Sequence, residues 1–158
     1  MLTVGLDLAG VESRSTGFCV LKYMNAETSL VYKDEEIING IEMSKPEAVA
    51  IDAPLSLPIG RKSIEQRTNV HLRECDKELL RRKIKFFPIT LGPMRKLTTR
   101  GINLRKNLEN RRFKVIEVYP GGAQDVLEIP RKQLGLEKLK EGLEKLGVKG
   151  LKERISDH

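Results

Sequence analysis

Three acidic residues, Asp7, Asp52 and Glu117, each lie within or at the end of a short apolar run typical of a buried strand. A carboxylate buried without a partner costs several kcal/mol, so three of them meeting in space require a shared compensating charge. Mg²⁺ and Mn²⁺ prefer carboxylate oxygens and would supply that charge. The pattern therefore predicts a site for Mg²⁺ or Mn²⁺ built from these three acids, which are also the candidate catalytic residues.

Such a site favours hydrolysis of a phosphodiester. Two hard cations about 3.5–4 Å apart can activate a water molecule and stabilise the leaving oxygen of an in-line displacement. If the strands that end at Asp7 and Asp52 are parallel neighbours, both acids lie at the sheet edge where ligands of open α/β sheets bind. Glu117 is expected two residues inside the end of its strand, which spans 113–119.

Each acid also has a structural interpretation. Asp7 could cap the turn before Gly10, and Asp52 could form an Asx turn into Ala53 and Pro54. Glu117 could pair with one of the many arginines. The order of strands, with an acid on the first and on the fourth, favours the metal site over three unrelated roles.

The formal net charge of +7 is distributed unevenly along the chain. Residues 1–60 carry 4 basic and 9 acidic side chains, residues 61–115 carry 17 and 5, and residues 116–158 carry 8 of each. The middle segment thus has a net charge of +12, which indicates a polyanionic partner such as DNA or RNA. The alternative is a solvated surface, which is what most charge runs form.

Six cations of this middle segment are candidate substrate contacts: Arg73, Lys77, Arg81, Arg95, Lys96 and Arg100. The first three follow one face of a predicted helix at i, i+4 spacing and could hold phosphates. Glu74 and Glu78 lie on the same helix, so a network of structural ion pairs is an equally good interpretation.

The periodicity of apolar residues predicts a mixed α/β sheet, with three antiparallel strands, then parallel strands, and helices on both faces. The predicted strands are 2–8, 16–23, 29–33, 48–52 and 113–119. The predicted helices begin at Asp34, Ser63, Pro93, Gly121 and Pro130, the second running to about Lys83 and the last to Gly147. A final short segment carries Leu151 and Ile155.

This organisation predicts a single domain over residues 1–158 with a basic helical insertion at about 61–112. No run approaches the roughly 20 apolar residues of a membrane span, and no leader is evident, so we expect a cytoplasmic protein with no membrane partner. Cys19 and Cys75 are expected to be buried, reduced thiols. The oligomeric state is open, a homodimer included.

Several segments carry a resemblance that covers nearly the whole chain. They are residues 5–13, 16–17, 51–58, 73–76, 87–94 and 116–122. These segments resemble a family of mainly prokaryotic proteins of unknown function, described as predicted ribonuclease H-like nucleases. The resemblance implies the ribonuclease H-like fold, and it implies Asp7, Asp52 and Glu117 as metal-binding acids. Arg73 and Asp76 fall in an Arg-x-Cys-Asp-like element of the family.

One departure concerns the end of the chain. Members of that family continue into a further helix with an acidic element, whereas this chain stops at Ser156-Asp157-His158. The resemblance therefore implies truncation at the C-terminus, with Asp157 or a partner chain as substitutes for the missing acid.

Three other functions stay open. One is a non-catalytic nucleic-acid-binding or regulatory module of the same fold. Another is an actin-like phosphotransferase, although Asp7-Leu8-Ala9-Gly10 is one residue off the Asp-x-Gly spacing of that class and 158 residues provide only one of the two domains it needs. The third is binding of a small anion by backbone N–H groups at Gly121-Gly122.

Overall fold

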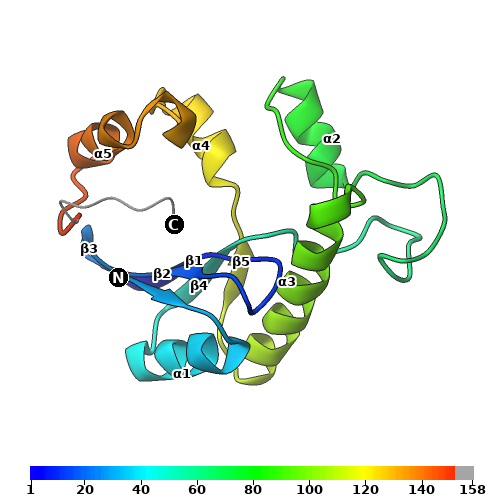
Figure 1. Cartoon of the computed structure of the whole chain (residues 1–158), viewed down its shortest axis with the longest axis horizontal. Coiled ribbons are helices and arrows are strands. Elements are labelled where there is room, and N and C mark those ends of the chain that lie inside the picture. The colour runs from blue at the N-terminus through cyan, green and yellow to red at the C-terminus, as the bar shows by residue number, and fades with distance from the viewer. Residues whose placement is uncertain (152–158) are drawn as a thin grey trace.

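The centre of the molecule is a five-stranded mixed sheet in a computed structural model that describes residues 1–151 (Figure 1). The strands are β1 (Leu2–Asp7), β2 (Thr16–Lys22), β3 (Asn25–Val31), β4 (Ala48–Asp52) and β5 (Val115–Glu117), in the order β3-β2-β1-β4-β5. β1, β2 and β3 pair antiparallel, whereas β4 pairs parallel with both β1 and β5. This confirms the predicted ribonuclease H-like arrangement.

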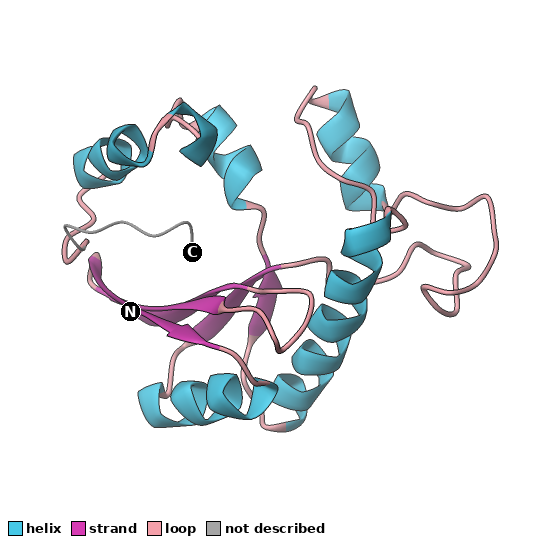
Figure 2. Ribbon diagram, viewed as in Figure 1, coloured by secondary structure: helices cyan, strands magenta, loops and turns pink. Residues whose placement is uncertain are grey.

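Helices lie on both sides of this sheet (Figure 2). The helices are α1 (Asp34–Ser44), α2 (Glu74–Arg81), α3 (Gly92–Asn110), α4 (Pro120–Val126) and α5 (Leu136–Lys145), with a 3-10 turn η1 (Lys132–Leu134) before α5. α1 and α3 lie below the sheet in Figure 1, and α4 and α5 lie above it. The side with α1 and α3 holds the hydrophobic core, whereas the side with α4 and α5 contains a cleft.

The hydrophobic core lies between the sheet and the pair α1 and α3. Its members on the strands and helices include Val4, Leu6, Val49, Ile51, Ile37, Ile41, Leu104 and Leu108. Side chains alternate between the two faces of a strand. Because Val4 and Leu6 face this core, Gly5 and Asp7 face the α4 and α5 side.

α3 packs very closely against the chain that follows β4. A Cβ atom at Gly101 would lie 3.0 Å from the carbonyl oxygen of Pro54. Any larger residue would push α3 away from the loop that begins at Asp52. Glycine is therefore required here for a close approach, which holds that loop against the core.

The predicted helix over 63–83 is wrong in its first half, because α2 spans only Glu74–Arg81. Arg61 explains the irregular segment before it. Its buried guanidinium donates to the carbonyl oxygens of Ser63, Ile64, Gln66 and Val70 at 2.7–3.0 Å. These side-chain hydrogen bonds hold the carbonyls in an irregular loop in place of a regular helix. The predicted burial of Cys75 is also wrong, because it is exposed, and Cys19 is only half-buried.

Other boundaries moved by a few residues. The hairpin turn falls at Tyr23 and Met24, both with positive φ, so β3 begins at Asn25 and not near Ser29. β5 ends at Glu117, two residues earlier than predicted. The helix predicted from Pro130 is divided at Gly135, whose φ of +118° is incompatible with a continuous helix.

The predicted roles of Ile155 and Asp157 lie outside the described residues. Within residues 1–151, no helix is long and apolar enough to cross a membrane.

Candidate functional site

Asp7 and Asp52 end the two parallel strands at the middle of the sheet and are register partners across them. Both side chains face the α4 and α5 side, because their strand neighbours Leu6 and Ile51 are buried in the opposite core. Both acids line the same cleft. The structure therefore brings together two of the three predicted metal-binding acids.

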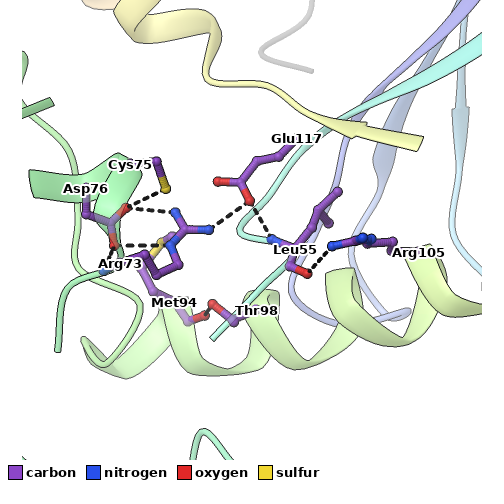
Figure 3. Close-up of polar contacts among 8 residues, drawn as sticks. All are labelled: Leu55, Arg73, Cys75, Asp76, Met94, Thr98, Arg105 and Glu117. Carbon is purple, nitrogen blue, oxygen red and sulfur yellow. Dashed lines mark hydrogen bonds and ion pairs between the residues drawn. The ribbon is translucent and has the colours of Figure 1, made fainter. Parts of the chain in front are cut away.

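Glu117 does not join them, for a reason of register. It pairs with Ile51, one residue before Asp52, so its side chain leaves the sheet on the opposite face. There its Oε2 accepts hydrogen bonds from the backbone N–H of Leu55 at 2.8 Å and from Arg73 Nη1 at 2.7 Å (Figure 3). Glu117 thus positions the loop after Asp52 and pairs with an arginine, as in the alternative to metal binding given for it above. Among the described residues, no group of three or more acidic, histidine or cysteine side chains could hold a metal.

Arg73, which donates to Glu117, is itself held by a second carboxylate. Its guanidinium also binds both carboxylate oxygens of Asp76, at 3.1 Å and 2.8 Å, and only 8% of its side chain is exposed. Burial by itself would lower the pKa of Arg73, but the hydrogen bonds to Asp76 and Glu117 raise it overall. Nε, Nη1 and Nη2 of Arg73 each donate to one of these two carboxylates, so the structure gives Arg73 a structural role, and its contact with substrate stays a prediction.

A similar support holds the chain that follows Asp7. The N–H of Ala9 donates to the buried Thr16 Oγ1 at 3.1 Å, and the carbonyl oxygen of Ala9 accepts from Arg100 Nη1 at 2.8 Å. Arg100 also binds Asp34 Oδ1 at 2.8 Å and is 7% exposed. The predicted substrate contact Arg100 is thus a positioning residue for the loop after Asp7.

The remaining predicted substrate contacts lie on the surface. Lys77 pairs with Glu74 at 2.7 Å, and Arg81 pairs with Glu78 at 2.6 Å. On α2 these cations therefore form the structural ion pairs that were the alternative to phosphate contacts. Arg95 pairs with Glu65, and Lys96 is exposed beside it. These three pairs neutralise cations that would otherwise attract phosphate.

The electrostatics of the acid pair are unfavourable without a partner. Burial, followed by repulsion from Asp7, raises the pKa of Asp52 to about 7; Lys132 opposes this and Glu117 adds a smaller repulsion. Two facing carboxylates with incomplete compensation form a natural cation site. They need more positive charge than Lys132 provides.

The cleft in front of the acids has a volume of about 730 Å³ and lies between the sheet and the segment from α4 to α5. The cations on that segment that line it are Arg131, Lys132 and Lys140. Of these, Arg131 is held by Asp125 and lies over the ring of Tyr119 at 5.9 Å. None of the three was predicted from the sequence, where the only signal was the basic and polar run 131–133 directly after Pro130.

These residues fit a divalent cation. Mg²⁺ is commonly held by one or two carboxylates, with water and substrate oxygens as its other ligands. Asp7 and Asp52 supply that number, and burial followed by repulsion from Asp7 raises the pKa of Asp52, a cost that a bound cation would offset. The donor set therefore suits Mg²⁺ or Mn²⁺ without Glu117.

Comparison with known proteins gives one relationship. Residues 5–146 match the model of a family described as "Protein of unknown function (DUF429)", and the chain belongs to this family. No curated protein and no solved structure gives a significant match.

Proposed function

We propose that the protein is a cytoplasmic, metal-dependent nuclease that hydrolyses phosphodiester bonds of nucleic acid. The observation that carries this proposal is the in-register pair Asp7 and Asp52, which faces a cleft with cations on its opposite wall. The +12 segment at 61–115 supports it less strongly, because several of its arginines serve the fold.

Each residue of the site has a part in this proposal. Asp7 and Asp52 would hold Mg²⁺ or Mn²⁺, which when bound activates water and neutralises charge on the phosphate. Lys132 and Lys140 would draw the phosphate into the cleft from the opposite side. In the overall reaction, the oxygen of water bonds to phosphorus, one phosphorus–oxygen bond breaks, and the departing sugar oxygen gains a proton.

A second function, a non-catalytic nucleic-acid-binding module, is favoured by one observation. Glu117 is committed to Leu55 and Arg73, so two acids at the site are left to hold metal. Such a module would bind nucleic acid in a salt-dependent manner without cutting it.

Cleavage assays separate these functions. End-labelled single-stranded and duplex DNA and RNA are incubated with the protein and Mn²⁺, alongside Asp52→Asn. The matched control is Glu35→Gln, the same carboxylate-to-amide change at an exposed position of α1. We expect cleavage by the parent and the control and none by Asp52→Asn. Cleavage that persists in Asp52→Asn refutes the site, and salt-sensitive binding with no cleavage by any form favours the module.

A further inference from the structure

The cleft beside the acids continues away from them across the sheet. Its floor consists of two neighbouring rows of residues on the face toward α4 and α5. They are Asp52, Asp7, Gly17 and Leu30 in the first row, and Ala50, Gly5, Cys19 and Thr28 in the second. The residues of the next row, which contains Thr3 and Ala48, do not line the cleft.

The spacing of strands and residues gives the dimensions of this floor. Successive rows on one face are two residues apart along a strand, which corresponds to roughly 7 Å. The distance across four neighbouring strands is roughly 14 Å. The floor is therefore a trough that is two rows wide and has the acids at its β4 end.

Small residues make the part of the floor beside the acids hollow. Gly17 lies next to Asp7 in the first row, and Cys19, Gly5 and Ala50 form most of the second. Glycine in the interior of a strand often marks the close approach of a ligand. Among the described residues, and apart from its chain neighbours, a Cβ at Gly5 would have only Cys19 Cβ within 4 Å, at 4.0 Å.

The apolar face of α5 lies over this floor without closing on it (Figure 1). Leu136, Leu139 and Leu143 lie on one face of α5 and line the cleft, yet α5 contains no buried residue. The volume of about 730 Å³ lies within the range of about 300–1,000 Å³ found for pockets that bind a small organic group. A metal ion and one phosphate need less space than this.

The shape and lining of the cleft suit a nucleoside. A nucleobase is flat and apolar on its faces and carries hydrogen-bonding groups along its edges. The cleft offers apolar side chains above a floor of small residues, and Gln124 and Gln133 contribute amides. The separation of roughly 7 Å between the acid row and the second row is comparable to the distance from a phosphate to the base of the same nucleotide.

We propose that the cleft accommodates one unpaired nucleobase of a single-stranded nucleic acid, with the phosphodiester of that nucleotide at Asp7 and Asp52. This inference rests on the proposed nuclease function and specifies its substrate as single-stranded. The base can come from any position in the strand, because only one nucleoside enters the cleft. A base within a duplex must first unpair and unstack, and this cost weakens binding of duplexes.

The two cysteines allow a test that needs no turnover. Cys19 lines the cleft, whereas Cys75 is exposed elsewhere and serves as a control within the same molecule. The full chain is alkylated with N-ethylmaleimide in Ca²⁺, which replaces Mn²⁺ so that bound strands are not cut. Mass spectrometry follows the modification of each cysteine.

Four ligands are compared in this experiment, each in a DNA and an RNA form. They are a short single strand, the same strand annealed to its complement, a strand of equal length with abasic sugars at every position, and a nucleoside monophosphate. The abasic strand is the matched control, because it keeps every phosphate and lacks only the bases.

The single strand should slow alkylation of Cys19 by about tenfold or more at saturation, equivalent to occupancy of most molecules. At the same concentration, the duplex and the abasic strand should slow it by less than about twofold, and alkylation of Cys75 should not change. No protection by the single strand overturns the proposal. Equal protection by the duplex or the abasic strand, or protection by the monophosphate alone, also overturns it.

A pair of variants on β4 tests the same cleft without depending on thiol reactivity. Ala50→Leu fills the floor, whereas Ala48→Leu places the same side chain on the same face, one row outside the lining. By fluorescence anisotropy, we expect Ala50→Leu to weaken binding of the single strand about tenfold and Ala48→Leu less than about twofold. Circular dichroism establishes that both variants fold, and equal affinities would contradict the proposal.

Failure of this inference and failure of the proposed function give different results. If Mn²⁺-dependent cleavage requires Asp52, but duplexes are cut as fast as single strands and Cys19 is not protected, the nuclease stands and the nucleobase site falls. If single strands protect Cys19 but no form of the protein cleaves them, the nucleobase site stands and catalysis falls.

Discussion

Replacing Asp52 by asparagine should stabilise the protein, with a gain that depends on pH. The pKa of Asp52 rises from 3.8 to about 7 on folding, mainly through burial and then through repulsion from Asp7. Well below pH 3.8 the carboxyl is protonated in both the folded and the unfolded state, so its charge costs nothing. Between pH 4 and 7 the unfolded state releases the proton first, and stability therefore falls as pH rises.

The size of the effect follows from those two pKa values. Each pH unit between them is worth about 1.4 kcal/mol, which gives an upper limit of about 4 kcal/mol above pH 7. Because Asp52 retains some contact with solvent in the cleft, screening reduces this. We expect Asp52→Asn to gain about 2–3 kcal/mol relative to the parent between pH 4 and pH 8.

Urea denaturation across this pH range measures the difference. Asp125→Asn is the control with the opposite sign, because the hydrogen bond from Arg131 lowers the pKa of that exposed carboxyl. Mg²⁺ adds a second readout. If the cation binds between Asp7 and Asp52, it should reduce the loss of stability in the parent above pH 6 and have little effect on Asp52→Asn.

Two results would refute the reasoning. A difference between parent and Asp52→Asn that stays constant from pH 4 to pH 8 would mean that Asp52 titrates normally. A variant that becomes less stable than the parent as pH rises would mean that Asp52 is held as an anion by groups the proposal overlooks.

Three further predictions concern the residues that hold the two loops. Arg73→Met leaves Asp76 buried without its partner and should cost about 3–5 kcal/mol in urea denaturation, whereas Lys77→Ala breaks a surface pair and should cost less than about 1 kcal/mol. Arg100→Met should cost about 2–3 kcal/mol by the same measurement, because the variant loses hydrogen bonds to two carbonyls and a carboxylate; an unchanged midpoint would contradict its role. Glu117→Gln should lower the melting temperature but leave Mn²⁺ affinity unchanged within about twofold by calorimetry, and a large loss of affinity would restore Glu117 as a ligand.

The sheet and the acid pair could be predicted because their signals are local. The apolar run that ends at Asp52 matches β4 residue for residue, and the periodicity of Leu104 and Leu108 places the inner face of α3. The prediction for the hairpin was less accurate, because the residues of its turn, Tyr23 and Met24, are not those that normally accept positive φ.

The position of Glu117 could not be predicted, because one residue of register decides its face. The apolar pattern of residues 113–119 does not show which face Glu117 takes. Only its pairing with Ile51 places its side chain on the other face of the sheet from Asp52. Arg100 is a similar case, since its partners Asp34 and Ala9 are 66 and 91 residues away in the chain. The local charge pattern indicated a phosphate contact because it contains no information about those partners.

The sequence by itself therefore determined the order of the strands and the two carboxylates at their ends, since apolar runs and short connections depend on neighbouring residues. Tertiary structure alone decided which arginines are buried, which face Glu117 takes and that Lys132 lies across from Asp52. It also created the cleft, because Gly5, Cys19 and Ala50 become one hollow row only when three strands pair in this register.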